Sequence, residues 1–175
     1  MTPETLRLIA LLITAAVAAI FDWRTRRIPN LLTVPAMVIG VALWGLESWR
    51  GVGVSLLCLV VTLAAGLALQ SAGVVGGGDV KLLAAVSAFA AWPLFREMLI
   101  WIALFGGAVA LVVLASRRAL VPLFRSLARS GLLFFRFGVV ENPVEGEGHK
   151  IPYAVVIAGG ALCAVAASYR GFRFL

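Results

Sequence analysis

The sequence has few charged residues for its length and very few acids. Only 13% of its 175 residues are Asp, Glu, Lys or Arg, whereas 62% are hydrophobic. A soluble domain has about a quarter of its residues charged and about half apolar, which excludes an ordinary water-exposed globular fold. The mean hydropathy of +1.05 indicates instead an all-α integral membrane protein whose surface mostly contacts the lipid bilayer.

Residues that bind metals or form disulfides are equally scarce. The two cysteines, Cys58 and Cys163, each lie alone in an apolar stretch, and the single histidine, His149, lies in a polar segment. Without a C-x-x-C pair, the sequence offers neither a zinc site nor a disulfide framework. We therefore expect no metal and no other cofactor, and we interpret the polar residues near position 145 as solvated: Glu141, Glu145, Glu147 and His149.

Apolar segments follow one another along the whole chain. With loosely defined ends, they cover residues 6–21, 31–46, 52–72, 80–91, 98–115 and 151–168. A helix needs about 20 apolar residues to cross a bilayer, or somewhat fewer where the bilayer thins. We therefore expect about six transmembrane helices in a single domain over residues 1–175. The first segment lacks the flanks of a signal peptide, so we expect it to be retained.

The cations lie between these segments and indicate an orientation. Ten fall on one side of the membrane: Arg24, Arg26, Arg27, Lys81, Arg117, Arg118, Arg125, Arg129, Arg136 and Lys150. Five fall on the other: Arg7, Arg50, Arg96, Arg170 and Arg173. Because cations favour cytoplasmic loops, we expect the first side to be cytoplasmic and both termini to be periplasmic. The net charge of +7 thus predicts membrane topology rather than a nucleic-acid partner.

The only long connection is the expected cytoplasmic loop over residues 116–150. Within it, apolar residues at positions 120, 123, 124 and 127 have helical spacing, with cations on the opposite face. This pattern predicts a basic amphipathic helix. Such a helix either lies on the anionic inner leaflet or packs against the protein as a strut, and the sequence leaves both interpretations open.

The chain has only two aspartates, Asp22 at the end of the first segment and Asp79 at the start of the fourth. The predicted topology places both at the cytoplasmic edge of the membrane, where carboxylates are costly unless they are solvated or paired. Two carboxyl groups about 3 Å apart share one proton, because both cannot ionise. Such a pair can hydrolyse an amide by general acid–base catalysis without a metal.

Each aspartate also has a purely structural interpretation. Asp22 would end a helix or pair with Arg24 or Arg26, and Asp79 would be the N-cap of the fourth helix. Lys81 either lowers the pKa of a carboxyl group, holds a lipid phosphate or only orients the chain.

A run of glycines, Gly76, Gly77 and Gly78, directly precedes Asp79. Glycine permits positive φ and a close approach of another chain, including a substrate strand. A phosphate-binding loop is excluded, because no Lys-Ser or Lys-Thr follows in register. A simple break between helices remains the alternative.

These stretches resemble the two signatures of the type IV prepilin peptidases, a family of intramembrane aspartyl proteases. The first signature is Asp22 followed by Ile28-Pro29-Asn30, and the second is Gly-x-Gly-Asp-x-Lys at residues 76–81. Residues 150–154, Lys-Ile-Pro-Tyr-Ala, are similar to the Lys-x-Pro-Tyr-Gly of the short branch that serves Flp/Tad pili, with Ala154 in place of glycine. The resemblance covers the whole chain.

The resemblance implies a function that the residues alone do not. It implies an enzyme of the inner membrane that cleaves leader peptides from prepilins and pseudopilins at the cytoplasmic face, after a glycine. Asp22 and Asp79 would be catalytic, and the supporting substrate-binding residues would be Gly76, Gly77, Gly78, Lys81, Pro29 and Asn30. Long members also carry a four-cysteine zinc loop and N-methylate the product. This chain lacks those cysteines, so we expect peptidase activity alone.

Two other classes of function stay open. Intramembrane carboxylates also occur in proton-coupled transporters, although a relay favours the middle of the membrane over its edge. A catalytically silent membrane protein of pilus assembly is the third possibility.

Overall fold

The computed structural model describes residues 2–72, 75–116 and 153–171, and within these ranges every regular element is a helix. The helices are α1 (Pro3–Thr25), α2 (Asn30–Gly45), α3 (Trp49–Ser71), α4 (Gly77–Ala90), α5 (Leu94–Ser116) and α7 (Tyr153–Tyr169). Each of them overlaps one of the expected apolar segments. The expected amphipathic helix and the polar residues 141–149 lie outside the described residues.

The chain divides into two compact units. The first contains residues 1–106 and 152–175, and the second contains residues 107–151. Only the C-terminal part of α5 is described in the second unit. Both aspartates and the described residues that contact them belong to the first unit.

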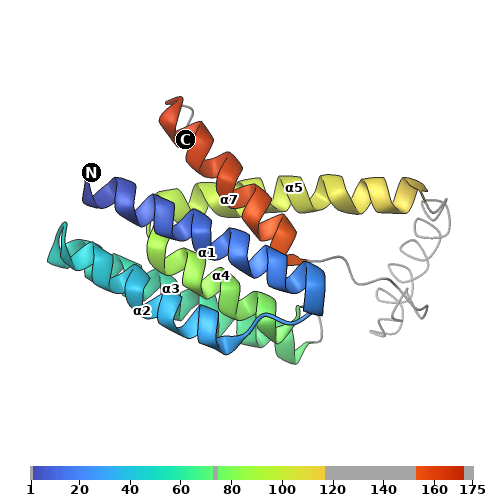
Figure 1. Ribbon diagram of the computed structural model, residues 1–175, viewed down its shortest axis with the longest axis horizontal. Coiled ribbons are helices and arrows are strands. Elements are labelled where there is room, and N and C mark those ends of the chain that lie inside the picture. The colour runs from blue at the N-terminus through green and yellow to red at the C-terminus, as the bar shows by residue number, and fades with distance from the viewer. Residues whose placement is uncertain (1, 73–74, 117–152, 172–175) are drawn as a thin grey trace, which may run out of the picture. The chain divides into compact units, whose positions relative to one another are not determined.

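α4 lies at the centre of the first unit, with α1, α2 and α3 packed against it (Figure 1). Nearly every residue from Val80 to Ala90 is buried. Small residues allow the neighbouring helices to approach closely. A Cβ added at Gly40 of α2 would lie 3.0 Å from the Cβ of Ala88, and one at Gly66 of α3 would collide with Val80. The short fourth helix is therefore enclosed by protein rather than by lipid.

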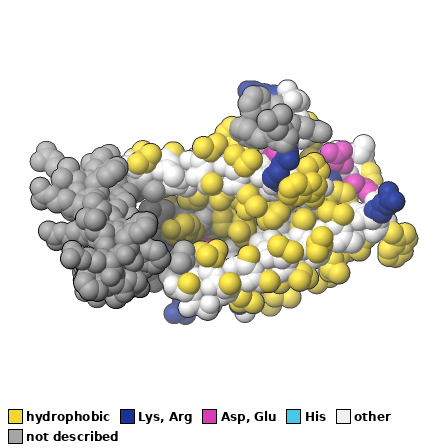
Figure 2. All heavy atoms as spheres, turned by 180° about the vertical axis from the view of Figure 1, so that it is seen from behind, with side chains coloured by type: hydrophobic (Ala, Val, Ile, Leu, Met, Phe, Trp, Pro, Cys, Tyr) yellow, Lys and Arg dark blue, Asp and Glu magenta, His cyan; other side chains and the backbone are white. Residues whose placement is uncertain are grey.

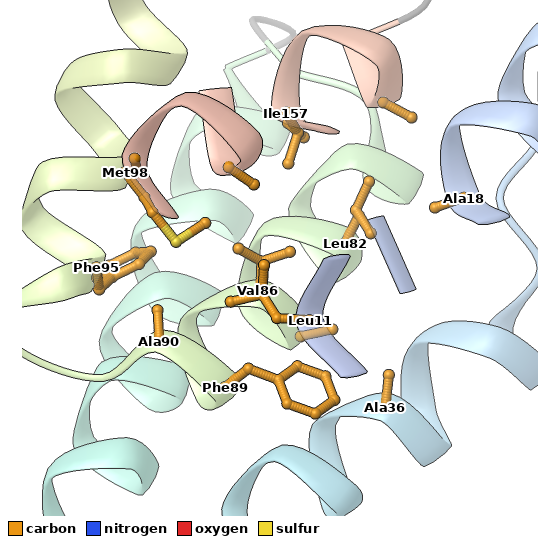
Figure 3. Packing of buried hydrophobic residues seen from close by; sticks show 14 residues of the cluster. Leu11, Ala18, Ala36, Leu82, Val86, Phe89, Ala90, Phe95, Met98 and Ile157 are labelled. Carbon is orange, nitrogen blue, oxygen red and sulfur yellow. The ribbon is translucent and has the colours of Figure 1, made fainter. Parts of the chain in front are cut away.

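The core of the first unit lies between α4 and its neighbours. Leu82, Val86 and Phe89 of α4 meet Leu11 of α1 and Ile157 of α7 (Figure 3). At the C-terminal end of α4, two carbonyl groups receive hydrogen bonds from side chains of other helices: Ser55 Oγ donates to Ala88 O at 2.6 Å, and Trp44 Nε1 donates to Phe89 O at 3.2 Å. These bonds satisfy carbonyls that have no partner within the helix itself.

Large apolar side chains cover much of the outer surface (Figure 2). Leu31, Val38 and Leu57 are each more than half exposed. An apolar surface of this extent is unfavourable in water and typical of lipid contact. Two of the described helices, α1 and α3, are long and apolar enough to cross a membrane, while α2 and α7 are shorter apolar helices. The fold is that of a helical membrane protein, and the crossing of all six segments stays a prediction.

Candidate active site

Asp22 lies near the C-terminal end of α1, on the face that is buried against the rest of the unit. The buried residues Leu11, Ala15 and Ala18 precede it at helical spacing, and Asp22 itself is only 8% exposed. The helix ends at Thr25, and its C-cap residue Arg26 adopts a left-handed conformation with φ of 53° and donates its N–H to Asp22 O at 2.9 Å. Asp22 thus lies on the same buried face of α1 as these apolar residues.

The N-terminal end of α7 holds the Asp22 side chain. The backbone N–H of Ala154 donates to Asp22 Oδ2 at 3.2 Å. Amides in the first turn of a helix have no partner within the helix, and they carry the positive end of the helix dipole. A hydrogen bond from such an amide to a carboxylate is stronger than one between neutral groups and fixes the orientation of the oxygen.

Asp79 lies in the first turn of α4 and is partly exposed. Its backbone N–H donates to Gly76 O at 3.1 Å. The N-cap of α4 is Gly76, with φ of −73° and ψ of 144°, and it makes no side-chain capping bond. The structural interpretation of Asp79 as the N-cap is therefore wrong. Its side chain does not cap the helix and is left available for another role.

The two carboxyl groups are close enough to influence each other. Burial raises the pKa of the Asp79 carboxyl above its ordinary value, and repulsion from Asp22 raises that pKa further. Asp79 precedes the apolar stretch that begins at Val80, so this effect arises at the edge of the helix bundle. A raised pKa means that Asp79 keeps its proton to a higher pH than an isolated aspartate does. The ends of α1 and α4 thus bring the only two aspartates of the chain into one site.

The glycine run permits close contacts. A Cβ added at Gly76 would lie 2.9 Å from Asp79 Oδ2, and one at Gly77 would lie 3.0 Å from Gln70 Nε2 at the end of α3. At Gly78 the same atom would lie 3.5 Å from Ile28. The positive φ that glycine permits is not used at Gly76. Gly76 instead leaves space for the Asp79 carboxylate.

The turn at residues 28–30 is bound to the first turn of α4. Lys81 Nζ donates to Asn30 Oδ1 at 2.9 Å, and Ile28 packs against Gly78. Pro29 is the N-cap of α2, and its carbonyl accepts from the N–H of Leu32 at 3.1 Å. The two sequence signatures therefore meet in space, and the Lys81 ammonium group is engaged by an amide oxygen.

Two contacts of this site have no signal in the sequence. Nothing in the residue pattern indicates that the Ala154 N–H binds Asp22, although Ala154 ends a stretch singled out for its resemblance to a known motif. Gln70, which lies against Gly77, follows no motif either. Residues 150–152 of that stretch lie outside the described residues. Among the residues that the structure describes, no cluster of three or more His, Cys, Asp or Glu side chains is placed to hold a metal ion.

Comparison with known proteins gives one match. A family model described as the type IV leader peptidase family matches residues 9–114. The matched range includes both aspartates, the turn at residues 28–30 and the glycine run. No curated protein and no solved structure was found to match the chain.

Proposed function

Because the chain belongs to the type IV leader peptidase family, we propose that Asp22 and Asp79 are the catalytic pair of an aspartyl endopeptidase that removes the leader peptides of type IV prepilins. The family match makes the chain a membrane-embedded protease of the leader peptidase type. The aspartic mechanism rests on one observation, the electrostatic interaction of the two carboxyl groups at the ends of α1 and α4.

The environments of the two carboxyl groups favour different roles in the reaction. Asp22, oriented by the Ala154 N–H, is placed to accept a proton from a water molecule as the water oxygen attacks the scissile carbonyl carbon. Asp79, whose pKa is raised, is suited to donate a proton to the carbonyl oxygen. Collapse of the tetrahedral intermediate then breaks the C–N bond: the proton held by Asp22 passes to the leaving amine, and the hydroxyl group formed from the carbonyl oxygen returns its proton to Asp79 as the new carboxyl group forms.

The proposal also includes the class of substrate and the orientation of the enzyme in the membrane. The stretch at residues 150–154 favours Flp-type prepilins as substrates, cleaved at the cytoplasmic face of the inner membrane with both termini of the enzyme in the periplasm. The exposed Gly76 beside Asp79 allows a substrate strand to approach the carboxyl group. Gly77, Gly78, Lys81, Pro29 and Asn30 would support that strand indirectly, by fixing the start of α4 against the turn before α2.

Cleavage by the purified chain tests the proposal. We expect liposomes that contain only this protein and an Flp-type prepilin to yield the mature pilin, identified by mass spectrometry of its new N-terminus. Since the mechanism uses carboxyl groups alone, a metal chelator should leave the rate unchanged, and addition of a methyl donor should leave the new terminus unmethylated. Sensitivity to the chelator would contradict the mechanism. Absence of cleavage together with proton flux across the liposomes would favour a transporter.

The bond between α7 and Asp22 provides a separate prediction. We expect Ala154→Pro to lower the cleavage rate by about tenfold or more, because it removes the only hydrogen of the Ala154 backbone amide, and a hydrogen bond to a charged group contributes about 1.5–3 kcal/mol. Proline is tolerated in the first turn of a helix, where no intrahelical bond is lost.

Ala154→Gly is the matched control, because it keeps the amide donor while also altering the side chain. It should cleave at nearly the wild-type rate. Thermal unfolding in detergent would show whether each variant is folded, since Ala154 is fully buried and the proline ring needs space. A folded Ala154→Pro variant with full activity would show that Asp22 needs no bond from α7.

A further inference from the structure

Gln70 lies at the C-terminal end of α3, next to the proposed catalytic site. It is the only glutamine of the chain, and it follows the exposed apolar residues Leu67 and Leu69. Residues 72–76 connect α3 to α4, so Gln70 and the glycine run lie at the same end of the first unit (Figure 1). The side chain of Gln70 can therefore reach the first turn of α4.

The amide group of Gln70 lies against Gly77. A Cβ added at Gly77 would lie 3.0 Å from Gln70 Nε2 and 3.2 Å from both its Cδ and its Oε1. Because these three atoms are almost equidistant from that point, the amide presents its face to Gly77 rather than its N–H or C=O edge. A side chain at residue 77 would displace the amide, since ordinary contacts are about 3.5–4.0 Å long. The space left by the glycine at residue 77 is thus occupied by the Gln70 amide.

Both polar edges of this amide are available to another molecule. Gln70 is exposed, and within the described part of the chain its side chain forms no hydrogen bond. Its neighbour Ser71 differs, since Ser71 Oγ donates to Ala68 O at 2.8 Å within α3. A glutamine side chain has an NH₂ group that donates and a carbonyl oxygen that accepts. Gln70 can therefore bind one N–H group and one C=O group of a second chain at the same time.

The amide is close enough to Asp79 for both groups to contact one substrate strand. A Cβ at Gly76 would lie 2.9 Å from Asp79 Oδ2, and the one at the adjacent Gly77 would lie 3.0 Å from Gln70 Nε2. With standard backbone dimensions, Oδ2 and Nε2 are at most about 13 Å apart. An extended chain advances by about 3.3 Å per residue. A peptide group bound by Gln70 therefore lies within about four residues of the bond beside Asp79.

An extended substrate at this place needs partners for its backbone. At the edge of a bilayer, N–H and C=O groups that are not paired within a helix are costly unless another group binds them. A side-chain amide that pairs with a peptide group acts as a sheet edge does when it binds an extended peptide, whatever the side chains of that peptide are. Two such hydrogen bonds would fix the strand relative to the two carboxyl groups.

We propose that Gln70 is a substrate-binding residue, whose amide hydrogen-bonds one backbone peptide group of the leader-peptide substrate within about four residues of the scissile bond. The inference rests on the proposed function, because it assigns a further contact to the same site. It adds a residue of α3 to a site formed by α1, α4 and α7. The contact is remote from the reacting atoms and is made equally in the ground state and the transition state, so its loss raises KM and leaves kcat unchanged.

Gln70→Leu tests the contact, since leucine has neither a donor nor an acceptor. We expect KM for a prepilin to rise about tenfold at a nearly unchanged kcat, because two hydrogen bonds to neutral groups are lost. Ser71→Ala is the matched control. It removes a polar group from the adjacent residue of the same helix end, and both constants should stay at the wild-type values. An unchanged KM in Gln70→Leu would overturn the proposal.

Substrates with an ester in place of one backbone amide distinguish a direct contact from a packing effect on Gly77. An ester lacks the N–H group that a peptide bond donates. We expect an ester at one position within four residues of the scissile bond to lower kcat/KM about fivefold in the wild type and to have no further effect in Gln70→Leu, because both changes remove the same hydrogen bond. Additive effects at every position would show that Gln70 does not bind the backbone.

Binding to the Asp79→Asn variant separates this inference from the proposed mechanism. The Kd of a prepilin peptide is measured for Asp79→Asn alone and for Asp79→Asn combined with Gln70→Leu. We expect the second Kd to be about tenfold higher, whether or not Asp79 is catalytic. Equal values would refute the contact with Gln70 and leave the proposed function intact. A wild-type protein that binds no prepilin would instead refute the proposed function, and this contact with it.

Discussion

We expect Asp79→Asn to lower the rate of leader-peptide cleavage by about 10²–10⁴-fold, which is the usual contribution of a general acid or base. The amide has nearly the shape of the carboxyl group, but it cannot supply the acidic proton that the carbonyl oxygen needs. The substitution also removes the repulsion between Asp79 and Asp22. The variant should therefore unfold at the same temperature as the wild type or at a higher one, and loss of activity would not reflect loss of fold.

The measurement is the initial cleavage rate in liposomes, with a prepilin in excess and the product resolved by gel shift. Asp22→Asn should lower the cleavage rate to a similar level, because one carboxyl group alone cannot act as both the acid and the base. Glu97→Gln is the control for exchanging an acid for an amide elsewhere, and it should cleave normally. Persistent cleavage by either purified aspartate variant would refute the aspartic mechanism and leave the family assignment intact.

The second large effect is expected at a residue without a side chain. Gly76→Ala should lower the cleavage rate by about 10²-fold, since a displacement of about 1 Å at a reacting group has consequences of that size. The new Cβ would lie 2.9 Å from Asp79 Oδ2, so the carboxylate must move. Because that atom is the end of a side chain and the φ of Gly76 is −73°, alanine fits the backbone and the fold should be preserved.

Gly53→Ala is the matched control for this substitution. Gly53 is also a glycine of the first unit, but a Cβ added there meets no atom within 4 Å. It should leave the rate unchanged. For Gly76→Ala, a lower kcat with a similar KM would indicate a misplaced catalytic group, whereas a raised KM alone would indicate a blocked substrate strand. Wild-type kinetics would show that the Asp79 carboxylate tolerates the displacement.

The helices themselves were predictable from the sequence. Runs of apolar residues long enough to approach the thickness of a bilayer leave few alternatives, because a lipid-exposed backbone must satisfy its own hydrogen bonds. The ends were less predictable, since α1 extends through Thr25 and includes the charged residue Arg24 after Asp22. The helix continues until Arg26, which adopts a left-handed conformation. Hydropathy does not predict where such a residue ends a helix.

The local sequence also left several roles open for particular polar groups. Asp79 follows a glycine run, which is a typical place for an N-cap, yet Gly76 occupies that position. Lys81 lies two residues after an aspartate, yet its ammonium group binds Asn30. In both cases the local sequence permits several partners, and the packing of α4 against the turn at residues 28–30 selects one of them.

The sequence by itself determined that this chain is a helical membrane protein, and it placed its two aspartates at the ends of two apolar segments. Hydrophobicity and residue type are local properties, so a single sequence suffices for them. The tertiary structure alone decided that those ends lie close to each other, that Ala154 binds Asp22 and that Arg7 pairs with Glu47. These contacts join helices far apart in the chain, and they depend on the close packing of small residues around α4, which helical periodicity does not specify.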